Sequence, residues 1–260
     1  MALSTNISLK FLKLLAHDVR WHLLEALAES DRRVQELVEV LQRPQNLVSY
    51  HLRLLREGQL VQERRSSADA RDVYYRLDLE HLRGLYLDSG QALHPSLSCT
   101  ELPKVNQPET DMGEAKRPYR FLFLCTQNSA RSQMAEGILR VKGGSRVEVF
   151  SAGSEPGQVH PLAIQATAAM NIDISQQQAK HMEAFEGQTF DYIITVCDKV
   201  REVCPVFPDD PKQIHWSVPD PAKEVGSQMQ QLQAFTQTAT ELTSRINYLL
   251  LMMEHRQQHS

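Results

Sequence analysis

Cysteine is scarce in this chain: four occur among 260 residues, at positions 99, 125, 197 and 204. A chain of this length, with 42% hydrophobic residues, can bury a sizeable core. It needs no disulfide framework, so a small disulfide-stapled domain is excluded. In a reducing compartment, a cysteine with a functional role is either a reactive thiol or a metal ligand. The sequence context of each cysteine therefore decides whether it is a candidate for chemistry.

Long apolar runs and a strong charge of one sign are also missing. No run approaches the ~18 residues that a membrane helix needs. Residues 1–18 lack the uninterrupted apolar stretch and the small-residue cleavage site of a signal peptide. We therefore expect a cytoplasmic protein with no membrane partner. The net charge of −4, from 28 basic and 32 acidic residues, excludes a uniformly basic nucleic-acid binder but not a local basic patch.

The chain divides at a polar segment, residues 88–117, which contains three prolines and no hydrophobic periodicity. Residues 1–87, before it, show mainly helical patterns. In residues 118–260, after it, apolar strand-like runs alternate with helical stretches, which is typical of a parallel α/β sheet. We therefore predict a mainly α N-terminal domain, a linker and an α/β C-terminal domain with these boundaries.

The N-terminal segment has the pattern of a helix-turn-helix followed by a hairpin. Apolar residues at helical spacing predict a first helix over 12–27, a short second helix over 34–41 and a third over 45–56, with Gly58 as its C-cap. Two strand-like runs then flank SSADAR, residues 66–71. A basic hairpin of this kind beside a helix-turn-helix can straddle the DNA backbone.

The exposed face of the third helix and the hairpin supply the candidate DNA contacts. Polar side chains on the helix can read base edges, and arginines near the hairpin tip can hold phosphates. A small helical domain with a solvated charged surface is the alternative interpretation. The candidates are Gln45, Asn46, Ser49, Tyr50, Arg53, Arg64, Arg65 and Arg71.

The stretches AHDVRWHLLEAL, SYHLRLLREGQLV and ERR…RDVYYRL resemble the ArsR-type winged-helix repressors over about residues 8–87. The resemblance implies binding to a palindromic operator as a homodimer, in which the first helix and the last, about 79–90, pair across a two-fold axis. Members that sense arsenite or soft metals often carry a cysteine pair before the recognition helix. Residues 1–98 contain no cysteine, so we expect no metal site in this domain.

The C-terminal domain contains a Cys-x5-Arg segment between a strand-like run and a helical stretch. Cys125 ends the run YRFLFLC, and Arg131 opens the helix. Backbone N–H groups of such a loop cradle a tetrahedral oxyanion, and the arginine adds a planar fork. We expect this positive field to lower the pKa of Cys125, Asn128 to brace the loop and Ser132 to donate a hydrogen bond to the thiolate. The predicted oxyanion loop is Thr126, Gln127, Asn128, Ser129, Ala130, Arg131 and Ser132.

Two further features belong to the candidate site. Cys197 and Cys204 follow another apolar run, and a thiol there can resolve a nucleophilic cysteine by thiol–disulfide exchange. Two incidental thiols are the alternative, and the spacing does not fit a zinc pair. Asp220 stands between two prolines, which would hold its carboxyl group over the anion site as a general acid. Taken alone, an Asp-Pro loop is more often just a turn.

Together CTQNSARSQMAEG, VFSAG, NIDIS, VCDKVREVCP and HWSVPDPA resemble the thioredoxin-coupled arsenate reductases of the low-molecular-weight tyrosine phosphatase fold. The resemblance implies a four-stranded parallel sheet with helices on both faces. It implies that Cys125 is the nucleophile, Arg131 binds the oxyanion and Asp220 is the acid. It also implies that Cys197 and Cys204 form the resolving pair, whose disulfide is reduced by thioredoxin or a similar thiol donor.

The likeness spans about residues 118–255 and includes departures. Some relatives bind a potassium ion through an Asn, a Glu, a Ser and an Asp. Asn128, Glu136 and Ser151 match that set, but Lys180 stands where the Asp aligns. An ammonium group there can replace the ion. We therefore do not expect a potassium requirement or another tightly bound cofactor.

Three functions fit these patterns. The first is a transcriptional regulator fused to an arsenate reductase. In the second, the oxyanion domain only senses arsenate, phosphate or redox state for a DNA-binding regulator. The third is a tyrosine phosphatase with a DNA-binding domain. The cysteine pair favours the reductase, because phosphatases of this fold need no such pair and often place tyrosines where Ala222, Lys223 and Glu224 stand here. Cys99, in the linker, is either a passive thiol or one that binds arsenite together with a thiol of the other domain and so releases the protein from its operator.

Overall fold

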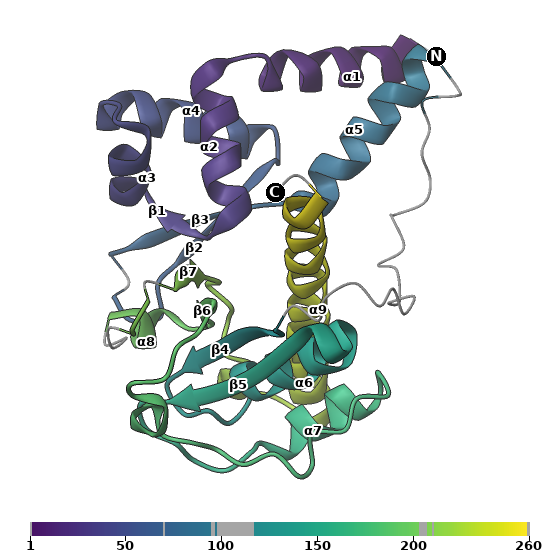
Figure 1. The fold of residues 1–260 in the computed structure, drawn as a ribbon. Coiled ribbons are helices and arrows are strands. Elements are labelled where there is room, and N and C mark those ends of the chain that lie inside the picture. The colour runs from purple at the N-terminus through teal and green to yellow at the C-terminus, as the bar shows by residue number, and fades with distance from the viewer. Residues whose placement is uncertain are drawn as a thin grey trace. The chain divides into compact units, whose positions relative to one another are not determined.

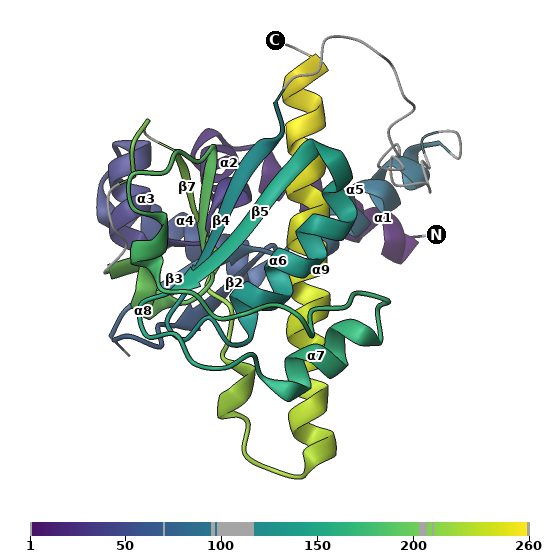
Figure 2. The ribbon, with the colours of Figure 1, turned by 60° about the horizontal axis from the view of Figure 1, so that its bottom comes forward.

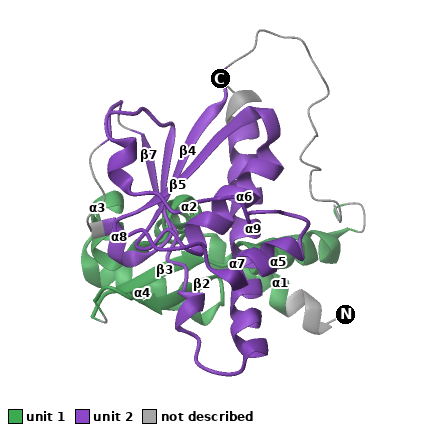
Figure 3. Cartoon of the chain, turned by 90° about the horizontal axis from the view of Figure 1, so that it is seen from below, with its two compact units in different colours: residues 1–104 green, residues 105–260 purple. Residues whose placement is uncertain are grey.

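The computed structural model describes residues 2–69, 71–94, 97, 117–202, 207–209 and 211–258. The chain forms two compact units, residues 1–104 and 105–260 (Figures 1 and 3). Each unit has a hydrophobic core of its own. Among the described residues, no helix is both long and apolar enough to cross a bilayer.

The N-terminal unit is mainly helical and carries a small antiparallel sheet with the strand order β1-β3-β2. The second and third predicted helices are α3 and α4, and β2 and β3 form the predicted hairpin, in which Val61 pairs with Leu77 and Arg65 pairs with Val73. The elements are α1 (Ala2–Leu15), α2 (Asp18–Glu29), β1 (Arg32–Arg33), α3 (Val34–Leu41), α4 (Gln45–Glu57), β2 (Val61–Arg65), β3 (Val73–Leu77) and α5 (Leu79–Leu93).

Two boundaries in this unit differ from the prediction. The helix expected over 12–27 is interrupted, because His17 has an extended backbone (φ −155°, ψ 127°) and its Nδ1 accepts a hydrogen bond from the N–H of Val19. His17 thus caps α2 and separates it from α1. Residues 88–93, which we assigned to the linker, belong to α5. This helix packs against α1, and the buried Ser89 hydroxyl donates to the carbonyl of Leu85.

Gly58 is the C-cap of α4, as predicted, but it does not supply a left-handed turn. Its φ is −81°, and the left-handed residue is Gln59, with φ 57°. A Cβ on Gly58 would lie 2.3 Å from Cδ2 of Leu14 in α1. The absence of a side chain therefore lets α4 and α1 approach closely. The buried core of this unit includes Val19, Leu23, Leu27, Leu37, Val48, Leu52 and Leu55.

The C-terminal unit is built on a four-stranded sheet with the order β5-β4-β6-β7, and all three strand pairs are parallel, which confirms the predicted α/β fold. Its strands are β4 (Tyr119–Cys125), β5 (Val147–Gly153), β6 (Tyr192–Thr195) and β7 (Lys212–His215). Its helices are α6 (Arg131–Gly143), α7 (Pro161–Ala168), α8 (Asp198–Glu202) and α9 (Gln228–Gln258), with short 3₁₀ turns η2 (Gly144–Arg146), η3 (Met182–Phe185) and η4 (Pro221–Lys223).

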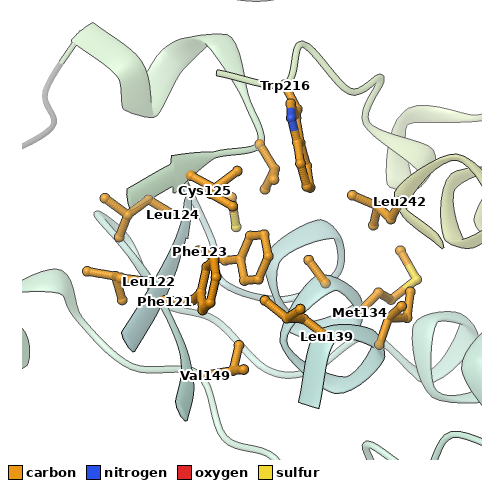
Figure 4. Packing of buried hydrophobic residues seen from close by; sticks show 14 of the residues in the cluster. Phe121, Leu122, Phe123, Leu124, Cys125, Met134, Leu139, Val149, Trp216 and Leu242 are labelled. Atoms are coloured by element: carbon orange, nitrogen blue, oxygen red, sulfur yellow. The ribbon is translucent and has the colours of Figure 1, made fainter. Parts of the chain in front are cut away.

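The helices of this unit cover the sheet. Helix α6 packs on β4 and β5 and against α9, and α7 also packs against α9 (Figure 2). The short helix α8 contacts β4 and β6. Strand β4 is buried without a break from Phe121 to Cys125, as expected for a central parallel strand. The rings of Phe123 and Trp216, whose centres are 6.0 Å apart, lie near Cys125 (Figure 4).

The strand register brings the candidate residues to one edge of the sheet. Cys125 pairs with Gly153 of β5, and Leu124 pairs with Thr195 of β6. Just past β6, the N–H of Val196 donates to the carbonyl of Leu124 at 2.8 Å. The segments that follow these strands therefore meet at the carboxyl edge, where open α/β sheets bind their ligands.

Candidate active site

The Cys-x5-Arg segment forms a tight loop between β4 and α6, and α6 begins at Arg131. Asn128 has a left-handed backbone (φ 47°), and its N–H donates to Cys125 Sγ at 3.1 Å. Ser132 Oγ lies 2.8 Å from the same sulfur. The loop thus wraps around the thiol and directs backbone and hydroxyl groups at it.

The buried side chain of Asn128 connects the loop to three other segments. Its Nδ2 donates to Ser132 Oγ at 2.9 Å and to Ser151 Oγ, at the end of β5, at 2.8 Å. Its Oδ1 accepts from the backbone N–H of Lys180 at 2.8 Å and from Gln133 Nε2 at 3.0 Å. Both ends of the amide are therefore engaged, which holds the loop in one conformation.

A buried carboxylate, Glu136, lies behind the loop. It accepts hydrogen bonds from the Ser151 hydroxyl and from Arg140 Nη2. The Lys180 ammonium lies 3.6 Å from its Oε2. The chain thus supplies its own cation, the Lys180 ammonium, beside Glu136, one of the three side chains that match the potassium-binding set. Within the described part of the chain, no three His, Cys, Asp or Glu residues form a cluster that could hold a metal ion.

Gly153 supports the loop through a close backbone contact that was not predicted from the sequence. A Cβ there would lie 2.4 Å from the carbonyl oxygen of Thr126 and 2.8 Å from the backbone nitrogen of Asn128. Only glycine lets β5 pass this close to the loop backbone. Nearby, the N–H of Glu155 donates to Thr126 O at 2.8 Å. The signal that could have found it was the small-residue sequence SAG at the end of a strand.

The structure brings Arg131 and Asp220 together at the loop. Arg131 Nη2 lies 3.1 Å from Asp220 Oδ2, and its Nη1 donates to the carbonyl of Val218 at 3.0 Å. The arginine side chain is 9% exposed and the aspartate 26%. Arg131, predicted to bind the oxyanion, is thus in direct contact with Asp220, the predicted general acid.

Cys197 lies beside the loop, just past the end of β6. It is buried, and its Sγ lies 3.3 Å from Oγ1 of Thr126, the residue that follows Cys125. Both Cys125 and Cys197 are free thiols. Cys204, predicted as the third thiol of the relay, and Cys99 lie outside the described residues.

Burial raises the pKa of the Cys125 thiol. Loss of solvent is the largest effect, and the neighbouring Cys197 adds to it. The hydrogen bond from Ser132 and the charge of Arg131 act in the opposite direction. The expectation of a lowered pKa is therefore wrong for this structure, because desolvation of the thiolate outweighs the positive field of the loop.

The candidate DNA contacts on α4 lie on its exposed face, opposite the buried Val48, Leu52 and Leu55. The Arg53 guanidinium lies 5.5 Å from the centre of the Tyr50 ring, a cation–π contact. The remaining candidates on this face, all exposed, are Gln45, Asn46 and Ser49.

The hairpin arginines differ in their surroundings. Arg65 is exposed and Arg64 half-buried on β2, whereas Arg71 lies in the connection to β3. Arg71 binds the Asp69 carboxylate through Nε and Nη2 at 2.6–3.1 Å, and these hydrogen bonds lower the pKa of Asp69 to about 2. The charge of Arg71 is therefore largely matched within the hairpin.

Comparison with known proteins finds a family match in each of the two units. Residues 120–259 match the family model "Low molecular weight phosphotyrosine protein phosphatase", and residues 17–63 match "Bacterial regulatory protein, arsR family". The chain belongs to the low molecular weight phosphotyrosine protein phosphatase family and carries an arsR-family helix-turn-helix in its N-terminal unit. The likeness to the low-molecular-weight tyrosine phosphatase fold and the likeness to the ArsR family are thereby confirmed.

Similar curated proteins are named arsenate reductase. The one from Halalkalibacterium halodurans is 38% identical over 124 residues, which are 48% of this chain and 89% of that protein. The one from Bacillus subtilis is 35% identical over the same shares. A solved structure described as an arsenate reductase in the phosphate binding state is 29% identical, with a TM-score of 0.43. The match covers 52% of this chain and 98% of that one.

Proposed function

We propose that this chain is a transcriptional regulator fused to an arsenate reductase. The observation that carries the proposal is the placement of Cys197 beside the loop of Cys125, at the ends of two adjacent parallel strands. A second buried thiol there gives the nucleophile a partner for thiol–disulfide exchange, which hydrolysis of a phosphate ester does not need. The identity to curated arsenate reductases supports the same substrate.

The proposed cycle uses the residues of the site in order. The Cys125 thiolate attacks arsenic in arsenate held by Arg131 and the loop, and Asp220 protonates the departing hydroxyl, which leaves as water. Cys197 then attacks Cys125 Sγ. The sulfur–arsenic bond breaks, its electron pair stays on arsenic, and arsenite leaves as the disulfide forms. Cys204 then attacks Cys197 Sγ, the Cys125–Cys197 bond breaks and Cys125 leaves as a thiolate, and thioredoxin or a similar thiol donor reduces the resulting Cys197–Cys204 disulfide.

The N-terminal unit binds operator DNA in this proposal. Helix α4 enters the major groove and the β2–β3 hairpin lies along the phosphate backbone. A homodimer would present two such helices to a palindromic site. Exposed apolar side chains on α1 and α5, including Ile7 (56% exposed), Leu9 (51%) and Tyr86 (64%), offer the surface for a second copy. Both partners, DNA and thioredoxin, imply a cytoplasmic protein.

One assay tests the enzymatic half of the proposal. The full chain is incubated with arsenate, thioredoxin, thioredoxin reductase and NADPH, and arsenite is measured directly. We expect turnover by the wild type and none by Cys125→Ser, because a serine hydroxyl is not ionised at neutral pH. Phosphate binding by the variant, measured by calorimetry, is the folding control for the C-terminal unit. If the wild type hydrolyses a phosphotyrosine substrate but does not reduce arsenate, the phosphatase alternative is favoured. If it does neither, the sensor alternative is favoured.

A further inference from the structure

Asp198, the residue directly after Cys197, has a fully buried carboxyl group that the proposed cycle does not use. Ser217 Oγ donates to its Oδ1 at 2.7 Å, and His215 Nε2 lies 3.2 Å from the same oxygen. His215 Nδ1 lies 2.8 Å from Thr195 Oγ1. All four polar residues of this cluster are buried. A buried carboxyl group is costly unless it is hydrogen-bonded, so its contacts hold it firmly in place.

This cluster fixes the backbone on the C-terminal side of Cys197. On the other side, Val196 is tied to β4 by its N–H, which donates to Leu124 O at 2.8 Å. Between these two anchors, the Cys197 sulfur lies 3.3 Å from the Thr126 hydroxyl. The attacking thiol is thus held from both neighbouring residues, next to the loop that carries Cys125.

The segment that follows β7 connects this anchor to the oxyanion half of the site. His215 and Ser217 contact Asp198, while the carbonyl of Val218 accepts from Arg131. A short stretch of chain therefore positions both the guanidinium group and the residue next to the resolving thiol. Displacement of the anchor would move Cys197 without removing any group that binds the oxyanion.

We propose that Asp198 is a positioning residue for the exchange between Cys197 and Cys125. The inference rests on the proposed function and specifies how its second step is prepared. The sulfur of Cys197 has to approach the Cys125 sulfur in line with the bond that breaks, and a misplacement of about 1 Å in such a step can cost about 100-fold in rate. A hydrogen-bonded anchor on the adjacent residue supplies that placement before arsenate binds.

The test follows disulfide formation without arsenate. The full chain with Cys99→Ser and Cys204→Ser keeps only Cys125 and Cys197, and diamide takes two electrons and two protons from this pair as the disulfide forms. Asp198→Asn preserves the shape and puts an amide in place of the carboxyl group that Ser217 and His215 contact. We expect disulfide formation, followed by mass spectrometry, to slow by about tenfold or more. Phosphate affinity, measured by calorimetry, should change by less than about twofold, because Arg131 and the loop remain intact.

Two more variants complete the experiment. Ser217→Ala keeps the carboxyl group of Asp198 and removes one of its hydrogen bonds, so we expect disulfide formation to slow, but by less than in Asp198→Asn. If Asp198→Asn does not fold, Ser217→Ala tests the proposal in its place. Thr238→Val removes a buried hydroxyl in α9 and should leave the rate unchanged. An unchanged rate in both anchor variants, or equal losses of rate and phosphate affinity, would overturn the proposal. Failure of the wild type to reduce arsenate would overturn the proposed function alone, because diamide oxidation does not depend on it.

Discussion

Asp220 Oδ2 lies 3.1 Å from Arg131 Nη2, so the proposed general acid contacts the guanidinium group that is proposed to hold the oxyanion. Guanidinium forks bind carboxylates and tetrahedral oxyanions through the same donors. The carboxylate and an incoming oxyanion therefore compete for part of one fork. Substrate binding has to turn this contact into one between Asp220 and a leaving oxygen.

Asp220→Asn separates the two roles of this aspartate. The amide replaces the carboxyl group that contacts Arg131 and removes the proton donor. We expect arsenate turnover to fall by about 100-fold or more, as for loss of a general acid. Phosphate should bind at least as tightly as to the wild type. Steady-state kinetics and calorimetry measure the two effects, and weaker phosphate binding with undiminished turnover would contradict the assigned roles.

The raised pKa of Cys125 predicts a pH dependence of its reactivity. Only the thiolate reacts with iodoacetamide, and burial and Cys197 both disfavour it. The alkylation rate of Cys125 should therefore keep rising with pH beyond about 8.5, where a free cysteine is half ionised. Ser132→Ala should move the midpoint higher, and Cys197→Ser should move it lower. Mass spectrometry of the Cys125 peptide checks this; a midpoint below pH 7 would show that the loop field dominates.

The hairpin arginines predict a salt dependence of DNA binding. Replacing Arg64 and Arg65 with alanine should weaken binding to all DNA sequences. It should also flatten the slope of log affinity against log salt by about 0.9 per lost phosphate contact. Arg71→Ala should change the slope less, because Asp69 already matches its charge. Lys142→Ala, in the C-terminal unit, is the single-charge control. An unchanged slope after the double substitution would mean that the hairpin does not touch DNA.

The contact between Lys180 and Glu136 predicts how the protein responds to potassium. Lys180→Met leaves the buried carboxylate without its nearby ammonium group. The lysine is 32% exposed, so we expect the free energy of unfolding to fall by only about 1 kcal/mol or less. Potassium should raise the melting temperature of the variant more than sodium does, and should have no such effect on the wild type. Equal responses of both proteins would contradict the replacement of an ion by Lys180.

Local pattern was enough to predict several elements closely. Strand β4 begins and ends where the run YRFLFLC does, and α3 coincides with its predicted range. The Cys-x5-Arg loop was also predictable, because it depends on residues only six positions apart between a strand and a helix. The interruption of a helix was harder to predict from the sequence. The break at His17 depends on one residue with an extended backbone, whose side chain caps the next helix.

Contacts between distant segments could not be predicted in the same way. The chain order suggested that Cys125, Cys197 and Asp220 belong to one site, but only the parallel register shows Cys197 next to Thr126. The bonds from Ser217 and His215 to Asp198 join residues 17 to 19 positions apart, and no spacing rule connects them.

The sequence by itself determined the two units, the parallel sheet and the identity of the loop that surrounds Cys125, because each follows from hydrophobic periodicity or from short-range spacing. The tertiary structure decided the direction of the Cys125 pKa, the pairing of Arg131 with Asp220 and the anchoring of Asp198. The physical reason is that desolvation and charge–charge interactions depend on every group packed around a site, and those groups come together only when the strands and helices assemble.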